Sequence, residues 1–126
     1  MKELKDYFCT PEQSQKLKEL GFIFAPIGYF FNYEGRTLLS VNMDLSEEED
    51  LRAPLRAQAL DFFREKGYET IIEKYEAGYG YAIRFKVKKD TIIHLQGDFT
   101  PYEESESMLI DRLIEMELDK EVQDGN

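Results

Sequence analysis

The chain has 126 residues, of which 42% are hydrophobic. That is enough for one compact domain with a buried core, but small for two. Its 26 acidic and 16 basic residues leave a net charge of -10. This charge repels phosphates and anionic membranes, so it argues against nucleic acid and membranes as partners. We expect a single globular domain over residues 1–126, with residues 121–126 as a frayed tail.

Cysteine content and hydropathy indicate the compartment. Cys9 is the only cysteine, so no intrachain disulfide can form and nothing points to an oxidising environment. The opening residues lack the apolar run of a signal peptide, and no later segment has the length of a membrane span. These observations predict a cytoplasmic protein.

A first helix is predicted from the sequence of residues 10–13. Thr10 supplies an N-cap hydroxyl, Pro11 suits the first helical position, and Gln13 can close a capping box. The helix is expected to end at Gly21, because glycine adopts positive φ readily at a helix C-terminus. Its apolar content is thin, which predicts a helix lying across the surface of the core.

A hairpin is predicted next, with strands over residues 28–33 and 36–43 and a turn at Glu34-Gly35. Aromatic rings lie on both faces of its first strand. Either both faces are therefore covered within the chain, or one is available to a partner.

The acidic connector over residues 44–50 contains a second capping-box pattern, at residues 46–49, which predicts the start of the next helix. We also tested it as a calcium loop beginning at Asn42. In that register Glu47 occupies the position that needs glycine, and Ala53 the position of the bidentate glutamate. The pattern therefore predicts no metal site.

The central part of the chain, residues 54–120, predicts the order helix, three strands, helix. The first helix covers residues 54–66, the meander residues 68–95, and the last helix residues 101–120. The middle strand alternates Tyr79, Tyr81, Ile83, Phe85 and Val87 with Gly80, Ala82, Arg84, Lys86 and Lys88. A period of two indicates one buried and one solvated face.

Two helix faces follow from the spacing of apolar residues. In the helix over 54–66 the apolar face holds Leu55, Ala59, Phe62 and Phe63, and the polar face holds Arg56, Asp61, Arg64 and Glu65. In the last helix Tyr102, Leu109, Ile110, Leu113, Ile114, Met116 and Leu118 form an apolar arc of roughly 200°. That arc is wider than one sheet face requires, so the first helix or a second copy of the protein would have to cover the surplus.

The predicted fold class is therefore α+β. It consists of a mainly antiparallel sheet, made of the N-terminal hairpin and the three-strand meander, packed by about three helices, with α-β-β-β-α order in residues 54–120.

Few residues invite a catalytic interpretation. His94 is the only histidine and lies in a short apolar strand, where an imidazole is more often structural than a base. Cys9 precedes a helix N-terminus, which can lower a thiol pKa, although a buried inert thiol fits it better. No phosphate-binding loop, dinucleotide fingerprint, nucleophile elbow or zinc motif is present. We therefore predict no catalytic, cofactor-binding or metal-binding residues and no cofactor.

The order helix, three strands, helix also occurs in double-stranded RNA-binding domains. Those domains need a basic start to the last helix so that it can contact phosphates. Here residues 102–106 carry three glutamates, which argues against RNA binding.

Several short segments of the chain together resemble known sequences. They are Tyr7-Phe8-Cys9-Thr10-Pro11-Glu12-Gln13-Ser14, Leu17-Lys18-Glu19-Leu20-Gly21-Phe22, Pro54-Leu55-Arg56-Ala57-Gln58-Ala59, Phe62-Phe63-Arg64-Glu65-Lys66, Gly78-Tyr79-Gly80-Tyr81 and Phe99-Thr100-Pro101-Tyr102-Glu103-Glu104. They resemble short uncharacterised proteins encoded by phages and prophage regions of gut bacteria related to Bacteroides. The resemblance is loose in the hairpin and assigns no activity. It implies a small accessory protein of phage origin rather than a metabolic enzyme.

Three functional hypotheses follow. The leading one is a non-enzymatic module that binds a protein partner or itself, through a candidate interaction surface of Tyr29, Phe30, Phe31, Tyr33, Ile114 and Leu118. The first alternative is a DNA mimic that inhibits a host DNA-binding protein and presents Glu104, Asp111, Glu115 and Asp119 on one exposed face. The second alternative is a small enzyme using His94, which would need a pocket with Cys9 or a carboxylate within reach.

Overall fold

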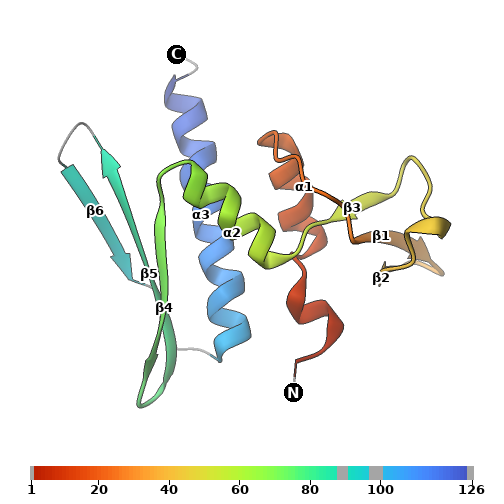
Figure 1. Cartoon of the computed structure of the whole chain (residues 1–126), viewed down its shortest axis with the longest axis horizontal. Helices are drawn as coiled ribbons and strands as arrows, with labels where there is room; N and C mark the ends of the chain where they lie inside the picture. Colours follow the sequence, from red (N-terminus) through yellow and green to blue (C-terminus); the bar gives the residue numbers. More distant parts are fainter. Residues whose placement is uncertain (1, 88–90, 97–100, 125–126) are drawn as a thin grey trace. The chain divides into compact units, whose positions relative to one another are not determined.

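The computed structural model describes residues 2–87, 91–96 and 101–124, with side chains placed for 2–84 and 101–120 (Figure 1). Its elements are the 3₁₀-helix η1 (Leu4–Tyr7), α1 (Pro11–Glu19), β1 (Gly28–Tyr33), β2 (Arg36–Ser40), the 3₁₀-helix η2 (Met43–Leu45), β3 (Leu51–Ala53), α2 (Arg56–Glu65), β4 (Glu69–Tyr75), β5 (Gly78–Val87), β6 (Thr91–Gln96) and α3 (Tyr102–Asp124). This order confirms the α+β class and the α-β-β-β-α arrangement of the central part.

By its contacts the chain divides into two compact units, residues 1–59 and residues 60–126, and the division falls inside α2. Each unit contains a three-stranded antiparallel sheet. The strand order is β2-β1-β3 in the first unit and β4-β5-β6 in the second. Whether the two units fold as one domain stays a prediction.

Helix α1 begins and ends as its sequence predicts. The Gln13 N–H donates to Thr10 Oγ1 at 3.1 Å, and the Thr10 N–H donates to Gln13 Oε1 at 2.9 Å, which closes the capping box. At the other end Gly21 has φ +84°, and the Phe22 N–H donates to the Leu17 carbonyl at 3.0 Å. These contacts form a Schellman ending, which glycine permits because it has no Cβ.

The predicted hairpin is present, with a shorter second strand. Glu34 and Gly35 have φ values of +48° and +77°, which is the geometry of a two-residue type I′ turn. Strand β2 ends at Ser40 and not at Met43. The Asn42 N–H donates to the Ser40 hydroxyl at 3.1 Å, so this amide is turned to a side chain and the strand does not continue.

Strand β3 replaces the helix start predicted at residues 46–49. Leu51 pairs with Phe30 of β1, and in the connector before it the Glu47 N–H donates to the Asp50 carboxylate at 2.7 Å. The capping-box prediction for residues 46–49 was therefore wrong. Three residues are too few to show a period of two, so the sequence contained no signal for this strand.

Helix α2 begins two residues later than predicted and buries a residue assigned to its polar face. At its start the Gln58 side chain acts as a cap, because Gln58 Oε1 accepts from the Leu55 N–H at 2.8 Å. Arg56 is buried, and its Nε donates to the Phe8 carbonyl at 3.2 Å. The helical wheel missed this because a long side chain in the first turn can reach a backbone acceptor from a distant segment.

The core of the first unit lies on one face of its sheet. Phe8, Phe30 and Ala53 are buried together, and Leu39, Leu51 and Leu55 pack against them. The register explains this grouping, because Leu39, Phe30 and Leu51 lie side by side across the three strands. Helix α1 contacts β3 at the edge of the same sheet (Figure 1).

In the second unit α3 packs against β5 and β4 (Figure 1). On the predicted inner face of β5, Tyr81 and Ile83 are buried, as the period of two required. Gly80 and Ala82 are also buried, although they were predicted to face solvent. Both are small residues of a central strand, so larger side chains on the flanking strands can cover them. Ala82, for example, is paired with Ile71 of β4. The side chains of Phe85 and the residues after it lie outside the described part.

Helix α3 continues to Asp124, beyond the end predicted at Lys120. Leu109, Ile110, Leu113 and Ile114 of its apolar arc are buried, Met116 and Leu118 are half-buried, and Tyr102 is exposed. Near its start the Ser105 hydroxyl donates to the Tyr79 carbonyl at 3.0 Å. The predicted N-cap, Thr100, lies outside the described residues.

Candidate interaction surface

The hairpin residues of the candidate surface divide between core and solvent. Tyr29 and Phe30 are buried, Phe31 is half-buried, and Tyr33 is 55% exposed. Phe30 belongs to the core cluster on one face of the sheet. Tyr29 and Phe31 lie on the other face of β1, with their ring centroids 5.8 Å apart. Tyr29 and Phe30 are therefore removed from the candidate surface, because the chain itself already covers them.

The α3 residues of the candidate surface also lie largely inside the chain. Ile114 is 1% exposed and Leu118 is half-buried. Ile114 is thus likewise removed, since a side chain without accessible area cannot contact a partner. Phe31, Tyr33 and Leu118 remain available in part.

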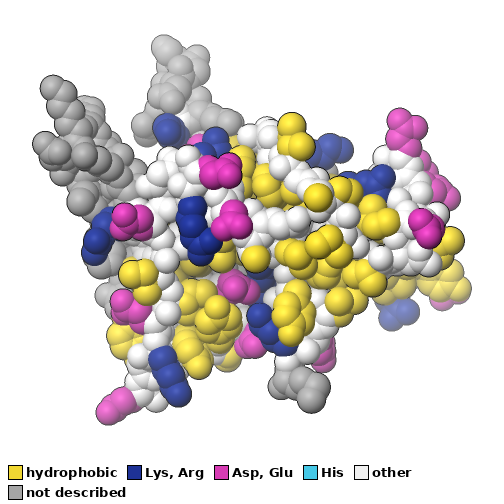
Figure 2. Space-filling view, viewed as in Figure 1, with side chains coloured by type: hydrophobic (Ala, Val, Ile, Leu, Met, Phe, Trp, Pro, Cys, Tyr) yellow, Lys and Arg dark blue, Asp and Glu magenta, His cyan; other side chains and the backbone are white. Residues whose placement is uncertain are grey.

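Exposed apolar side chains are concentrated elsewhere in the first unit. Of the nine exposed large hydrophobic side chains among the described residues, seven belong to residues 1–59. They are Leu4, Tyr7, Ile23, Ile27, Tyr33, Val41 and Leu45. Figure 2 shows hydrophobic side chains gathered over the region that this unit's strands occupy in Figure 1. An apolar concentration of this kind is typical of a surface that binds another protein.

The most exposed of these residues lies in an apolar run that the sequence analysis did not single out. Residues 22–27 are all apolar and connect α1 to β1 without helix or strand structure. The Phe22 and Phe24 rings stack at 5.0 Å, while Ile23 between them is 92% exposed. The Gln58 side chain donates to the Ala25 carbonyl at 3.0 Å, so the run is attached to the start of α2. The available signal was the length of the run, since exposed runs of this kind are uncommon outside binding sites.

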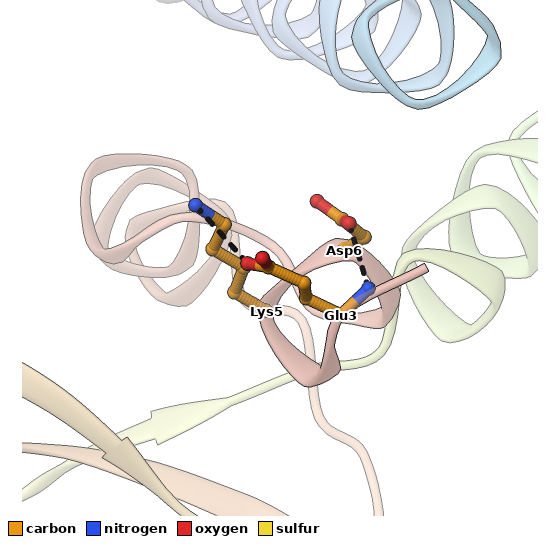
Figure 3. A network of polar contacts seen from close by, with 3 residues as sticks. All are labelled: Glu3, Lys5 and Asp6. Carbon is orange, nitrogen blue, oxygen red and sulfur yellow. Dashed lines mark hydrogen bonds and ion pairs between the residues drawn. The ribbon is translucent and has the colours of Figure 1, made fainter. Parts of the chain in front are cut away.

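A small polar network positions two further exposed apolar residues. In η1 the Glu3 N–H donates to Asp6 Oδ2 at 3.0 Å, and Lys5 Nζ lies 3.5 Å from Glu3 Oε2 (Figure 3). These contacts close the short turn that presents Leu4 and Tyr7 to solvent. All three charged side chains are near the surface, so their ion pair contributes little stability by itself.

The second unit contains a buried tyrosine and carboxylate that the sequence analysis missed. Tyr68 and Glu117 are 5% and 4% exposed, and the phenol hydrogen bonds to the carboxylate. Glu117 Oε1 has no hydrogen-bond partner among the described residues. Burial first, and then the charge of Glu117 and the hydrogen bond to it, raise the pKa of Tyr68 above its ordinary value. The phenol is thus a neutral donor and not a base at neutral pH.

The raised pKa of Tyr68 predicts a loss of stability in alkali. In the unfolded chain the phenol ionises near pH 10, whereas in the folded chain it remains neutral to higher pH. Its contribution is therefore complete below about pH 10 and is lost as pH rises toward the folded pKa. We expect the free energy of unfolding to fall by up to about 1 kcal/mol per pH unit above pH 10 from this group. Urea unfolding between about pH 9 and about pH 11 should show a shallower decline in Tyr68→Phe than in wild type. Equal declines would contradict the assignment.

The second unit also has a depression of about 170 Å³ between α2, β4 and α3. Several polar side chains line it: Arg64, Thr70, Tyr102 and Glu106. Burial first, and then the charge of Glu106, raise the pKa of Tyr102. Arg64 forms a salt bridge, with its Nη1 2.6 Å from Asp61 Oδ1. Because a raised pKa keeps the Tyr102 phenol protonated at neutral pH, this side chain can act as a hydrogen-bond donor.

The residues weighed earlier for chemistry belong to different units, Cys9 to the first and His94 to the second. Cys9 is buried, and its N–H donates to the Pro54 carbonyl at 2.9 Å. His94 lies in β6, where its backbone pairs with Arg84 of β5, and its side chain lies outside the described part. No three His, Cys, Asp or Glu side chains in the described residues are grouped so that they could hold a metal ion.

In the acidic connector over residues 44–50, the pKa of Glu47 is raised. The first cause is a hydrogen bond to Glu49, and the next are the charges of Glu49 and Asp50.

The four acidic residues named for DNA mimicry all lie on α3 and are all exposed: Glu104, Asp111, Glu115 and Asp119. The last three are spaced by four residues, which separates them by about 6 Å along the helix axis. Arg112 Nη1 lies 3.0 Å from Glu115 Oε2, so the charge of Glu115 is partly compensated.

Comparisons of the chain with protein-family models, with curated proteins and with solved structures found no match. Within the described ranges, no helix combines the length and the apolar content that crossing a membrane requires.

Proposed function

We propose that this chain is a non-enzymatic accessory module that binds another protein through the exposed apolar surface of residues 1–59. The observation that carries the proposal is the apolar run at residues 22–27, with Ile23 exposed over 92% of its area. Leaving such a side chain in water forgoes about 1.5–3 kcal/mol that its burial would supply. The resemblance to phage-encoded proteins adds the proposal that the module originates from a phage.

Two further features support a binding surface in this unit. Exposed apolar residues come from η1, the 22–27 run, the hairpin and the segment after it, so the surface draws on several parts of one compact unit. The 22–27 run is also held by the Gln58 contact, which limits the entropy lost when a partner binds.

Photo-cross-linking tests this proposal. Benzoylphenylalanine replaces Ile23 in one variant and the exposed Glu19 of α1 in a control variant. In an extract of cells that express the chain, position 23 should give a cross-link that excess wild-type protein suppresses. Ile23→Asp protein should compete at least about tenfold less well, because it loses the burial energy of one isoleucine. Equal competition by both proteins, or the same product from position 19, would refute the proposal.

A second candidate function is mimicry of DNA by α3, favoured by the exposure of all four acidic residues named for it. The test is displacement of labelled duplex from a DNA-binding protein at low salt. Wild type should displace it, and the triple variant Asp111→Asn/Glu115→Gln/Asp119→Asn should not, because the attraction is electrostatic. Failure of the wild type to displace DNA from any protein of a broad panel would eliminate this function.

A further inference from the structure

The sheet of the first unit has one covered edge and one open edge. At the β3 edge Phe8 forms a bridge to Leu55, the Cys9 N–H donates to the Pro54 carbonyl at 2.9 Å, and α1 contacts the strand. Strand β2 forms the other edge, and no strand pairs with its outer side among the described residues. An open edge is a row of backbone donors and acceptors that fits another extended strand.

The turn determines which groups of β2 face outward. In a hairpin with a two-residue loop, the two flanking residues, here Tyr33 and Arg36, form the first hydrogen-bonded pair. Bonded pairs alternate along an antiparallel ladder. The backbone N–H and C=O groups of Thr37 and Leu39 therefore point away from β1. These two residues are the ones that can pair with a new strand.

The side chains of β2 do not oppose such pairing. Proteins commonly protect an edge strand with charged residues, proline or a bulge. Strand β4, an edge of the other sheet, carries Glu69, Glu73 and Lys74. Strand β2 carries a single charge, Arg36, at its first position. Unlike β4, it is therefore an edge with little protection.

We propose that the outer edge of β2 pairs antiparallel with β2 of a second copy of this chain, centred on Leu38. This inference goes beyond the proposed function, because it adds a second copy of this chain as a partner at a different part of residues 1–59. In that register Thr37 faces Leu39 of the copy, which are the residues with outward backbone groups. Arg36 faces Ser40 of the copy, so no like charges are opposed.

The apolar content of one sheet face also favours a second copy. Leu38 is paired with Phe31 within the chain. Pairing around Leu38 extends this contact into a continuous row: Phe31, Leu38, Leu38 of the copy and Phe31 of the copy. Both partners supply the same patch, as an interface with twofold symmetry requires. The half-buried Phe31 and Leu38 would thereby gain apolar cover.

Disulfide cross-linking tests the register. In this arrangement the two copies of residue 38 form a non-hydrogen-bonded pair, with Cα atoms about 4.5 Å apart, within the range of a disulfide. Leu38→Cys should therefore form a covalent dimer under mild oxidation, while the native Cys9 is buried. Val41→Cys is the control, because the two copies of exposed residue 41 would lie about 20 Å apart along the strands. Absence of the residue 38 dimer, or equal cross-linking at residue 41, would overturn the proposal.

Light scattering, which needs no cross-linking, provides a second test. Thr37→Pro removes an outward N–H, which an edge strand tolerates, and Thr37→Val keeps it. We expect wild type and Thr37→Val to be dimers, and Thr37→Pro to dimerise at least tenfold more weakly with an unchanged circular dichroism spectrum. A monomeric wild type, or a Thr37→Pro protein that dimerises as well as Thr37→Val, would refute pairing through β2. The proposed function would be tested independently by the Ile23 cross-linking, because Ile23 lies outside β2.

Discussion

Phe63→Ala is expected to lower the free energy of unfolding by about 3–5 kcal/mol, the usual cost of removing a fully buried phenylalanine. Phe63 has no accessible surface, and its ring lies 6.1 Å from the ring of the buried Tyr68 in an edge-on contact. Alanine would leave a cavity and remove this aromatic contact, which adds to the loss. Since small proteins have a net stability of about 5–15 kcal/mol, the variant should unfold at a much lower urea concentration.

Phe62 is the matched control for this experiment. It is the preceding residue of the same helix, it is only half-buried, and Lys66 Nζ lies over its ring at 4.9 Å. Phe62→Ala makes the same chemical change with the same effect on helix propensity. It should cost less than half as much as Phe63→Ala in urea unfolding. Equal losses would show that the burial of Phe63 does not govern the stability of this region.

Tyr68→Phe is expected to cost about 2–3 kcal/mol, although it removes only one oxygen atom. The phenol is the hydrogen-bond donor to Glu117, whose Oε1 already lacks a partner among the described residues. Without the phenol, the buried carboxylate keeps its desolvation cost and loses a compensating hydrogen bond. Urea unfolding at neutral pH measures the loss.

The double variant Tyr68→Phe/Glu117→Leu separates the hydrogen bond from simple packing. When both partners become apolar groups of similar shape, no buried polar group is left unsatisfied, and the net cost can be small. We expect the double variant to be within about 1 kcal/mol of wild type. A double variant less stable than Tyr68→Phe would show that Glu117 has stabilising contacts beyond Tyr68.

Local backbone chemistry accounts for the predictions that succeeded. The first helix begins at a capping box and ends at a glycine with positive φ, and both signals lie within a few residues of the boundary. The turn at Glu34-Gly35 and the alternation in β5 are equally local. These signals depend on steric limits and hydrogen bonds between near neighbours, so they can be read without knowing the rest of the fold.

The candidate surface was predicted less well, because exposure depends on what the distant parts of the chain cover. Tyr29 and Phe30 looked as available as Tyr33, but in the structure β3 pairs with Tyr29 and Phe30 and does not reach Tyr33. Ile23 was overlooked because an apolar residue before a strand normally belongs to the core. The burial of two charged residues was also missed. Arg56 was assigned to the polar face of its helix and Glu117 was not considered, because charged side chains are seldom buried.

By itself, the sequence determined the fold class, the meander and the boundaries of the first helix, because hydrophobic periodicity and capping act over distances of a few residues. Tertiary structure alone decided that Leu51 to Ala53 form a strand, that Glu117 is buried against Tyr68, and that Ile23 faces solvent. The physical reason is that pairing and burial depend on residues far apart in the chain. Their partners are determined only when the sheets and helices have packed.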